Sequence, residues 1–220
     1  TPVMPGPTKA QHRELMRKFR RRFPSFRRAV REDARIFCLY RGERFEFRSR
    51  VDLLVQVVRL SWRSDAFLAL LCYRLKATLQ VHEVPILPSI LHRWAMVLGQ
   101  VCIGDPVVVA PGLYLPHGAV VIDGIVEIGP GVEVRPWVTI GLKEGNVNGA
   151  VIGPRAHIGT GAKVIGPVRI GADAQVGANA VVVHDVPPYS TVVGIPARVV
   201  RQRKPLSAHQ ENDSPDEAFI

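Results

Sequence analysis

Three histidines in the second half of the chain are the side chains best suited to acid–base or metal chemistry. They are His117, His157 and His184. A histidine-based metal site needs several ligands that converge on one ion, and these three are not grouped with ligand spacing. No metal is therefore expected. His117 stands apart because it lies in Pro116-His117-Gly118, where the spacing of the surrounding aliphatic residues changes.

That spacing belongs to a six-residue repeat that begins after Gly99. The recurring aliphatic residues are Ile103, Val109, Leu115, Ile122, Ile128, Val134, Ile140, Ile152, Ile158, Val164, Ile170, Val176 and Val182. Glycine often follows directly, where we expect a corner that other residues enter only at a cost. A small or aliphatic residue, such as Ala119 or Ala162, often stands four places later. Such a period predicts short strands joined by tight corners, with three strands in each triangular coil and coils stacked about 4.8 Å apart.

Two interruptions break this period. Between Leu115 and Ile122 the spacing is seven, so one residue is extra beside His117. Between Ile140 and Ile152, the polar stretch 142–149 lacks inward aliphatic residues and predicts a loop extruded from the coil. Loops on a rigid scaffold are frequent sites of binding residues.

The net charge of +10 is concentrated in residues 1–50, which hold 15 basic and 5 acidic side chains. Apolar residues at helical spacing predict basic helices from residue 11 and over 25–35, and further helices over 50–80 and 90–98. Within residues 36–47, Phe45 and Phe47 alternate with charged residues, and this pattern suggests a short strand. We therefore expect a flexible leader over 1–10 and a helical N-terminal domain over 11–99.

The remaining features concern the cellular setting and the end of the chain. Three cysteines without a CxxC motif predict neither a disulfide framework nor a zinc site. No secretory pattern opens the chain, and no apolar run reaches the roughly 20 residues of a membrane span. A cytoplasmic setting is expected, with no transmembrane segment, and the polar residues 205–220 predict a disordered tail.

Residues 100–204 resemble the serine O-acetyltransferases. The peptides that carry the resemblance are Gly112–Gly118, Pro136–Gly141, Ile158–Pro167, Ile170–Gly171, Val176–Val182, Asp185–Pro188 and Val193–Val200. The resemblance implies an α+β protein, in which the N-terminal helical domain is followed by a left-handed parallel β-helix of hexapeptide repeats. It also implies a homotrimer, or a dimer of trimers through the helical domain, with acetyl-CoA in the groove between subunits.

The same resemblance implies roles for particular residues. His117 would be the general base that takes the proton of an acceptor hydroxyl as it attacks the thioester. The turn beside the pantetheine arm would be Gly159, Thr160, Gly161 and Ala162, with free backbone N–H groups, and Ala178 would repeat it one coil later. The cations expected near the CoA phosphates are Lys163, Arg198, Arg201 and Lys204. His157 and His184 match no catalytic position and are expected to be structural or exposed.

Several positions depart from the family pattern. Pro116 replaces an aspartate, Asn148-Gly149 replaces an arginine–histidine pair, and Cys102 replaces the aspartate that orients the catalytic histidine. Asp105, three positions after Cys102, is the candidate to orient His117. Since the missing groups hold the amino and carboxylate groups of serine, the hydroxyl of a sugar or secondary metabolite competes with serine as the acceptor.

Two other classes of function remain open. One is a metal-dependent, carbonic anhydrase-like hexapeptide protein, which the scattered histidines disfavour. The other is a non-enzymatic binding protein whose Arg-rich segment 13–50 contacts RNA, an acidic carrier or anionic lipid. Nucleic acid is not expected as a partner, because the candidate catalytic and binding residues lie in the repeat block, which is nearly neutral. Binding that weakens steeply with salt would support the binding-protein interpretation.

Overall fold

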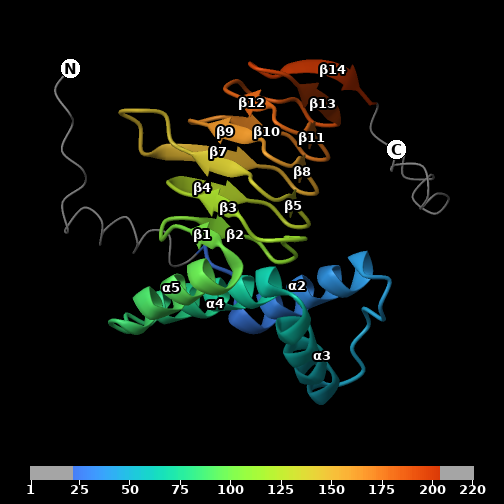
Figure 1. Cartoon of the computed structure of the whole chain (residues 1–220), viewed down its shortest axis with the longest axis vertical. Coiled ribbons are helices and arrows are strands. Elements are labelled where there is room, and N and C mark those ends of the chain that lie inside the picture. The colour runs from blue at the N-terminus through green and yellow to red at the C-terminus, as the bar shows by residue number, and fades with distance from the viewer. Residues whose placement is uncertain (1–21, 204–220) are drawn as a thin grey trace.

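The structure, a computed structural model, describes residues 22–203. The predicted leader, the first basic helix up to residue 21, Lys204 and the predicted tail lie outside the described residues. Figure 1 shows a layer of helices at one end of a tall stack of short strands, whose last strands lie at the opposite end. The stack therefore rests on the helical layer.

Four helices form the layer. They are α2 (Phe26–Tyr40), α3 (Arg50–Arg63), α4 (Asp65–Val81) and α5 (Leu87–Gly99). The helical run predicted over 50–80 is divided at Ser64, which ends α3 and whose side chain accepts a hydrogen bond from the Phe67 N–H at 3.2 Å. A side-chain acceptor at this position satisfies one of the free N–H groups at the start of a helix. Serine therefore sets where α4 begins.

The short strand predicted within residues 36–47 does not form. Helix α2 continues to Tyr40, and residues 41–49 form a turn and a loop without a strand. Phe37 and Cys38 are buried on the same helix as Ala34, so the burial of this face extends the helix past the predicted end at Arg35. The alternation of Phe45 with charged residues was misleading, because the Phe45 ring lies under the Arg35 guanidinium at 5.5 Å.

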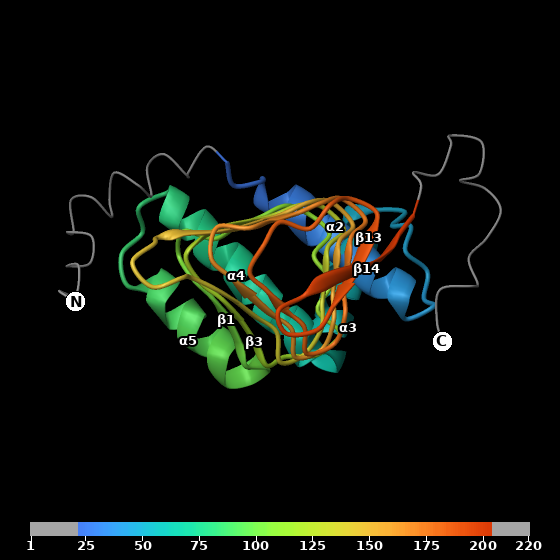
Figure 2. The ribbon, with the colours of Figure 1, turned by 90° about the horizontal axis from the view of Figure 1, so that it is seen from above.

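The strands form three sheets that make the three sides of the stack, and Figure 2 shows their triangular outline from above. Sheet A contains β1 (Val101–Ile103), β3 (Val120–Ile122), β6 (Thr139–Gly141), β9 (Lys163–Ile165) and β12 (Val181–Val182). Sheet B contains β2 (Val108–Val109), β4 (Ile125–Ile128), β7 (Asn148–Ile152) and β10 (Arg169–Ile170). Sheet C contains β5 (Glu133–Val134), β8 (His157–Ile158), β11 (Gln175–Val176), β13 (Ser190–Val193) and β14 (Arg198–Gln202). All pairs are parallel except β13 with β14, so the predicted three-sided coil is confirmed.

The repeat determines the core of this stack. Each of the predicted inward aliphatic residues, from Ile103 to Val182, is no more than 3 % exposed. The small residue expected at Ala119 is an exception, because Ala119 is only partly buried and Val120 fills the interior instead. The extra residue of the seven-residue spacing accounts for the shift by one position. The extruded loop covers 142–147, since β7 begins at Asn148.

Several glycines of the repeat, including Gly129, Gly153, Gly159 and Gly171, are explained by stacking and not by the expected corner conformation. A Cβ atom on Gly153 would lie 2.7 Å from the Ala172 nitrogen in the next coil. The left-handed backbone angle falls two residues later, where Trp137, Arg155 and other side-chain-bearing residues adopt it. Glycine is thus needed where successive coils approach most closely.

A buried ion pair joins the helices to the first coil. The Arg74 guanidinium donates to the Asp33 carboxylate at 2.8 and 3.0 Å, and both residues are at most 3 % exposed. Arg74 also donates to the Val109 carbonyl at 2.6 Å, and Asp33 accepts from the Gly112 N–H at 2.8 Å. Because these bonds satisfy both charges, the pair fixes the helical layer against the end of the stack.

Candidate active site

One edge of the triangular stack collects most of the predicted site residues. We call it the His117 corner; it consists of the turns at 115–119, 135–138, 159–162, 177–180 and 194–197, which leave sheet C. Backbone bonds connect one turn to the next: Trp137 N–H to the Ala119 carbonyl at 2.8 Å, Gly161 N–H to Pro136 at 2.9 Å, and Asn179 N–H to Thr160 at 2.8 Å. His117 therefore lies on the lowest turn of a continuous edge.

The extra residue of the repeat explains the placement of His117. Leu115 and Val120 are both fully buried, and the four residues between them form a turn one residue longer than the turn after Val134. This turn leaves the His117 side chain exposed to solvent. Gly118 packs against the end of α5, where a Cβ atom would collide with the Gly99 carbonyl. The histidine is thus held outside the coil, beside the helical layer.

A cavity of about 430 Å³ lies between this turn and the helices. Its lining residues are Asp65, Leu98, Gly99, Gln100, His117, Gly118, Ala119, Pro136 and Trp137. Asp65 comes from the first turn of α4, and the sequence analysis did not identify it. No repeat or motif marks this aspartate, because its place beside His117 depends on how the helices dock on the coil.

The turn expected to hold the pantetheine arm lies two turns above His117 on the same corner. The expectation of free N–H groups is wrong for three of its residues, which bond to neighbouring backbone carbonyls. These residues are Gly159, Gly161 and Ala162. The N–H groups of Thr160 and Ala178 have no hydrogen-bond partner within residues 22–203. They occupy equivalent positions in successive coils, so two donors remain along this edge.

The other predicted cofactor residues differ in burial and in their distance from the His117 cavity. Ala162 is fully buried inside the coil, so its side chain supports the turn and cannot contact an external ligand. The Lys163 ammonium group donates to the Trp137 carbonyl at 2.6 Å, close to the His117 cavity. Arg198 is exposed at the start of β14, directly after the uppermost turn, and Arg201 is exposed on the same strand.

Asp105 lies on a different edge from His117. We call this edge the Asp105 corner; it consists of the turns at 104–107, 123–124, 142–147, 166–168 and 183–185, which leave sheet A. The Asp105 carboxylate is 3.1 Å from the buried Lys76 ammonium group and does not line the His117 cavity. Burial raises the pKa of Asp105, but Lys76 and Gln80 outweigh it and hold the pKa below its ordinary value. The expected orienting contact with His117 is replaced by this ion pair.

The remaining histidines of the repeat lie apart from the cavity. His157 Nδ1 is 3.0 Å from the Glu133 carboxylate, which is only 5 % exposed. Burial raises the pKa of Glu133, but His157 and Arg135 outweigh it, so the net pKa is below the ordinary value. His184 is exposed on the Asp105 corner. Within residues 22–203, no group of three or more His, Cys, Asp or Glu side chains could hold a metal ion.

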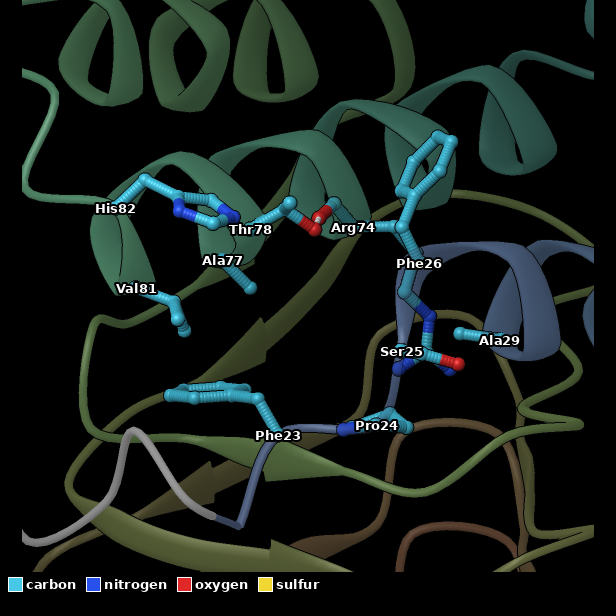
Figure 3. Close-up of a pocket in the computed structure, with 10 residues that line it drawn as sticks. All are labelled: Phe23, Pro24, Ser25, Phe26, Ala29, Arg74, Ala77, Thr78, Val81 and His82. Carbon is cyan, nitrogen blue, oxygen red and sulfur yellow. Dashed lines mark hydrogen bonds between the residues drawn. The ribbon is translucent and has the colours of Figure 1, made fainter.

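A second cavity, of about 260 Å³, lies between α4 and the segment that leads into α2. Figure 3 shows Phe23 and Val81 on opposite sides of this space, with Ala77 beside them. None of the predicted site residues lines it. In the described part of the chain, none of the helices is long and apolar enough to cross a membrane.

Comparisons with known proteins agree with this geometry. Residues 149–184 match the bacterial transferase hexapeptide family (six repeats). The serine acetyltransferase of Mycobacterium tuberculosis is 40% identical over 117 residues, which are 51% of this chain and 51% of that protein. The serine acetyltransferase of Helicobacter pylori strain J99 is 37% identical over 136 residues, which are 60% of this chain and 79% of that protein. The solved structure of the Neisseria gonorrhoeae serine acetyltransferase in complex with serine has a TM-score of 0.68 at 26% identity and covers 84% of this chain and 73% of that chain.

The stacked hexapeptide coil has the architecture expected of the bacterial transferase hexapeptide family, whose model it matches. The predicted fold class, a helical N-terminal domain followed by a left-handed parallel β-helix, is confirmed by the solved structure of the same fold. The chain belongs to the serine acetyltransferase family. It spans about half the length of the M. tuberculosis relative.

Proposed function

We propose that the protein is an acyltransferase that moves the acetyl group of acetyl-CoA to the hydroxyl group of a small acceptor. The observation that carries the proposal is the stacking of His117, the Thr160 turn and Ala178 on one corner. An exposed base at the foot of an edge with two free N–H donors suits a long, thin thioester whose reactive end must meet an alcohol. Serine is the reference acceptor because the relatives are serine acetyltransferases.

His117 would act as the general base. An alcohol is a weak nucleophile until its proton is removed, and imidazole is the side chain whose ordinary pKa lies nearest to neutrality. As the acceptor oxygen attacks the thioester carbonyl, its proton passes to His117. The C–S bond then breaks, and the imidazolium returns the proton to the leaving thiolate. The products are the acetyl ester and CoA.

The CoA arm would run up the His117 corner. Thr160 and Ala178 offer N–H donors for its amide carbonyls, and Gly161 presents no side chain that would block its approach. Four coil steps of about 4.8 Å separate the His117 turn from the uppermost turn, a span of about 19 Å. Arg198 stands at the upper end, where a cation can pair with phosphate.

We infer a trimeric assembly with the site between subunits, and a dimer of trimers through the helices. Support for the second contact comes from α3, where an apolar face remains uncovered: Val51, Leu54, Val55, Val58 and Trp62 are each at least 59 % exposed. Such a face is typical of an interaction surface. Light scattering would give the mass of the assembly, and the mass of a monomer would contradict a shared site.

A cytoplasmic location remains a prediction based on the three free cysteines.

An assay of thiol release tests the activity. The full chain is mixed with acetyl-CoA and serine, homoserine, sugars or amino sugars, and free CoA is measured. We expect release with a hydroxyl acceptor, and a loss of about 10²–10⁴-fold in His117→Ala. His184→Ala is the matched control, since His184 is also exposed but lies on the Asp105 corner. Equal activity in both variants would reject His117 as the base.

A second candidate function rests on the outer face of α2. Arg27, Arg28 and Arg31 are exposed, and no ion pair within residues 22–203 involves them. They border an open groove with Phe45 and Phe47. Such a face favours an anionic partner. Retention on a polyanionic resin that falls with salt, and is lost when the three arginines become glutamine, would support this function.

A further inference from the structure

The open groove on the outer face of α2 carries a net positive charge, and we call it the basic groove. Its volume is about 800 Å³, and four arginines and two glutamates give its lining a net charge of +2: Arg27, Arg28, Arg31, Arg35, Glu32 and Glu46. Arg27, Arg31 and Arg35 follow one another at intervals of four residues, so they lie on one face of the helix about 6 Å apart. Such a row of guanidinium groups attracts a chain with regularly spaced carboxylates.

The segment of opposite charge in this chain is residues 205–220, which we call the acidic segment. It contains Glu211, Asp213, Asp216 and Glu217 and neither lysine nor arginine. Residues 1–21, by contrast, hold six basic side chains and one acidic side chain, so the basic groove repels them. Carboxylates two positions apart in an extended chain, such as Glu211 and Asp213, are about 6.6 Å apart, close to the spacing of the arginines. Charge and spacing therefore favour the acidic segment as the occupant of the groove.

The helix that carries the groove and the last described residue lie at opposite ends of the same corner. This third corner, between sheets B and C, consists of the turns at 110–112, 129–131, 153–155, 171–173 and 187–189. At its lower end, the Asp33 carboxylate of α2 accepts a hydrogen bond from the Gly112 N–H at 2.8 Å. At its upper end, the Arg203 N–H donates to the Tyr189 carbonyl at 2.8 Å. Figures 1 and 2 both show α2 and β14 on the same side of the stack.

The length of chain after Arg203 matches the height of this corner. Four coil steps of about 4.8 Å separate the turn at 110–112 from the turn at 187–189, a height of about 19 Å. The eight residues from Arg203 to Glu211 span up to about 26 Å when extended. The remaining length of about 7 Å is enough to pass around the side of a helix, whose radius with side chains is about 5–6 Å. Glu211 is therefore within reach of the groove, and residues 213–217 can follow along it.

We propose that residues 211–217 occupy the basic groove of their own chain, with their carboxylates paired to Arg27, Arg28 and Arg31. This inference rests on the groove assigned to the second candidate function and requires no acetyl transfer. A segment tethered this closely has an effective concentration on the order of millimolar, so a contact of modest affinity is sufficient. The acidic segment then competes with any external anionic partner for the groove, and salt weakens its hold.

A labelled peptide tests this occupancy. The probe is a fluorescein-labelled peptide of residues 205–220, and its binding to full-length chains is followed by fluorescence anisotropy at low salt. One chain is the wild type, and the other has a neutralised acidic segment with the substitutions Glu211→Gln, Asp213→Asn, Asp216→Asn and Glu217→Gln. We expect the peptide to bind the wild type at least about tenfold more weakly than the neutralised chain, because the wild-type groove is already occupied. Equal affinity for the two chains would overturn the inference.

Substitutions in the groove show whether the peptide binds there. Arg27→Gln, Arg28→Gln and Arg31→Gln, introduced together into the neutralised chain, should weaken peptide binding by about tenfold or more, as expected for three exposed ion pairs. The matched control replaces three exposed arginines of other elements with glutamine: Arg63 of α3, Arg93 of α5 and Arg169 of β10. A loss of the same size in the control would indicate attraction to overall charge and would overturn the inference.

Two further measurements separate this inference from its neighbours. If the three groove arginines retain the wild-type chain on the polyanionic resin but the peptide does not bind the neutralised chain, the groove binds anions and the acidic segment is not its occupant. Light scattering should give the same mass for the wild-type and neutralised chains. A lower mass for the neutralised chain would show that the segment bridges two copies, and would overturn its occupancy within one chain.

Discussion

The His117 corner and the Asp105 corner are two edges of one coil, yet they differ in what they leave available. On the first, an imidazole is exposed and two N–H groups are unpaired within the described residues. On the second, the notable carboxylate is bound by a buried lysine that also donates to the Ile103 carbonyl at 2.6 Å. The first edge thus keeps polar groups exposed to solvent, whereas the second uses its carboxylate to dock the helices.

The difference shows that position around the coil decides the role of a residue. Asp105 lies three positions after Cys102, where the family pattern has the orienting aspartate. A shift of three residues along a six-residue repeat nevertheless moves a side chain from a side of the coil to its corner. Asp105 therefore contacts α4 and not His117.

The largest expected effect separates the two corners by activity. Asp105→Asn should change kcat/KM for acetyl transfer by less than about threefold, whereas His117→Ala should lower it by about 10²–10⁴-fold. The measurement is the rate of CoA release at fixed acceptor. A comparable loss in both variants would mean that the Asp105 corner takes part in the reaction.

The next effect concerns the stacking that both corners share. Gly153→Ala should lower the free energy of unfolding by about 1–3 kcal/mol, because the new methyl group meets the backbone of the next coil. Gly141→Ala is the control, since its Cβ atom would find its nearest neighbour at 3.9 Å. Denaturant unfolding measures both. Equal stability would contradict the explanation by close coil contact.

A third test introduces a larger side chain on the His117 corner, along which the CoA arm is proposed to bind. Ala178→Leu should raise KM for acetyl-CoA by about tenfold without a matching loss of stability, because Ala178 is exposed on the His117 corner. Ala172→Leu provides the control at the equivalent turn position of the third corner, between sheets B and C. An effect of the same size at Ala172 would show that bulk disturbs the coil in general.

The smallest effect is the pH dependence of stability at the Asp105 corner. Since the pKa of folded Asp105 lies below its ordinary value of 3.8, its ionised form stabilises the fold above about pH 4, and this contribution is lost as the pH falls through the folded pKa. The difference in Tm between wild type and Asp105→Asn should therefore shrink between about pH 6 and pH 3. A difference independent of pH would contradict the ion pair with Lys76.

The repeat made the core and the strand order predictable, because a period of six leaves one arrangement that buries all the aliphatic residues at the inward repeat positions, from Ile103 to Val182. The outward placement of His117 followed from the extra residue in its turn. Asp65 was not predictable, since its contact with the site depends on the docking of α4 and α5. Ala162 illustrates the opposite error: its motif suggested a ligand contact, while its place in the repeat required burial.

The two ends of the stack have a consequence for how the protein behaves at high concentration. A parallel coil ends in unpaired backbone groups that could accept a strand from another molecule. Helices cover the lower end, and at the upper end β14 turns back antiparallel on β13 with a register shift between Thr191 and Val192. Neither end therefore offers a regular parallel strand edge for the end-to-end addition of another coil.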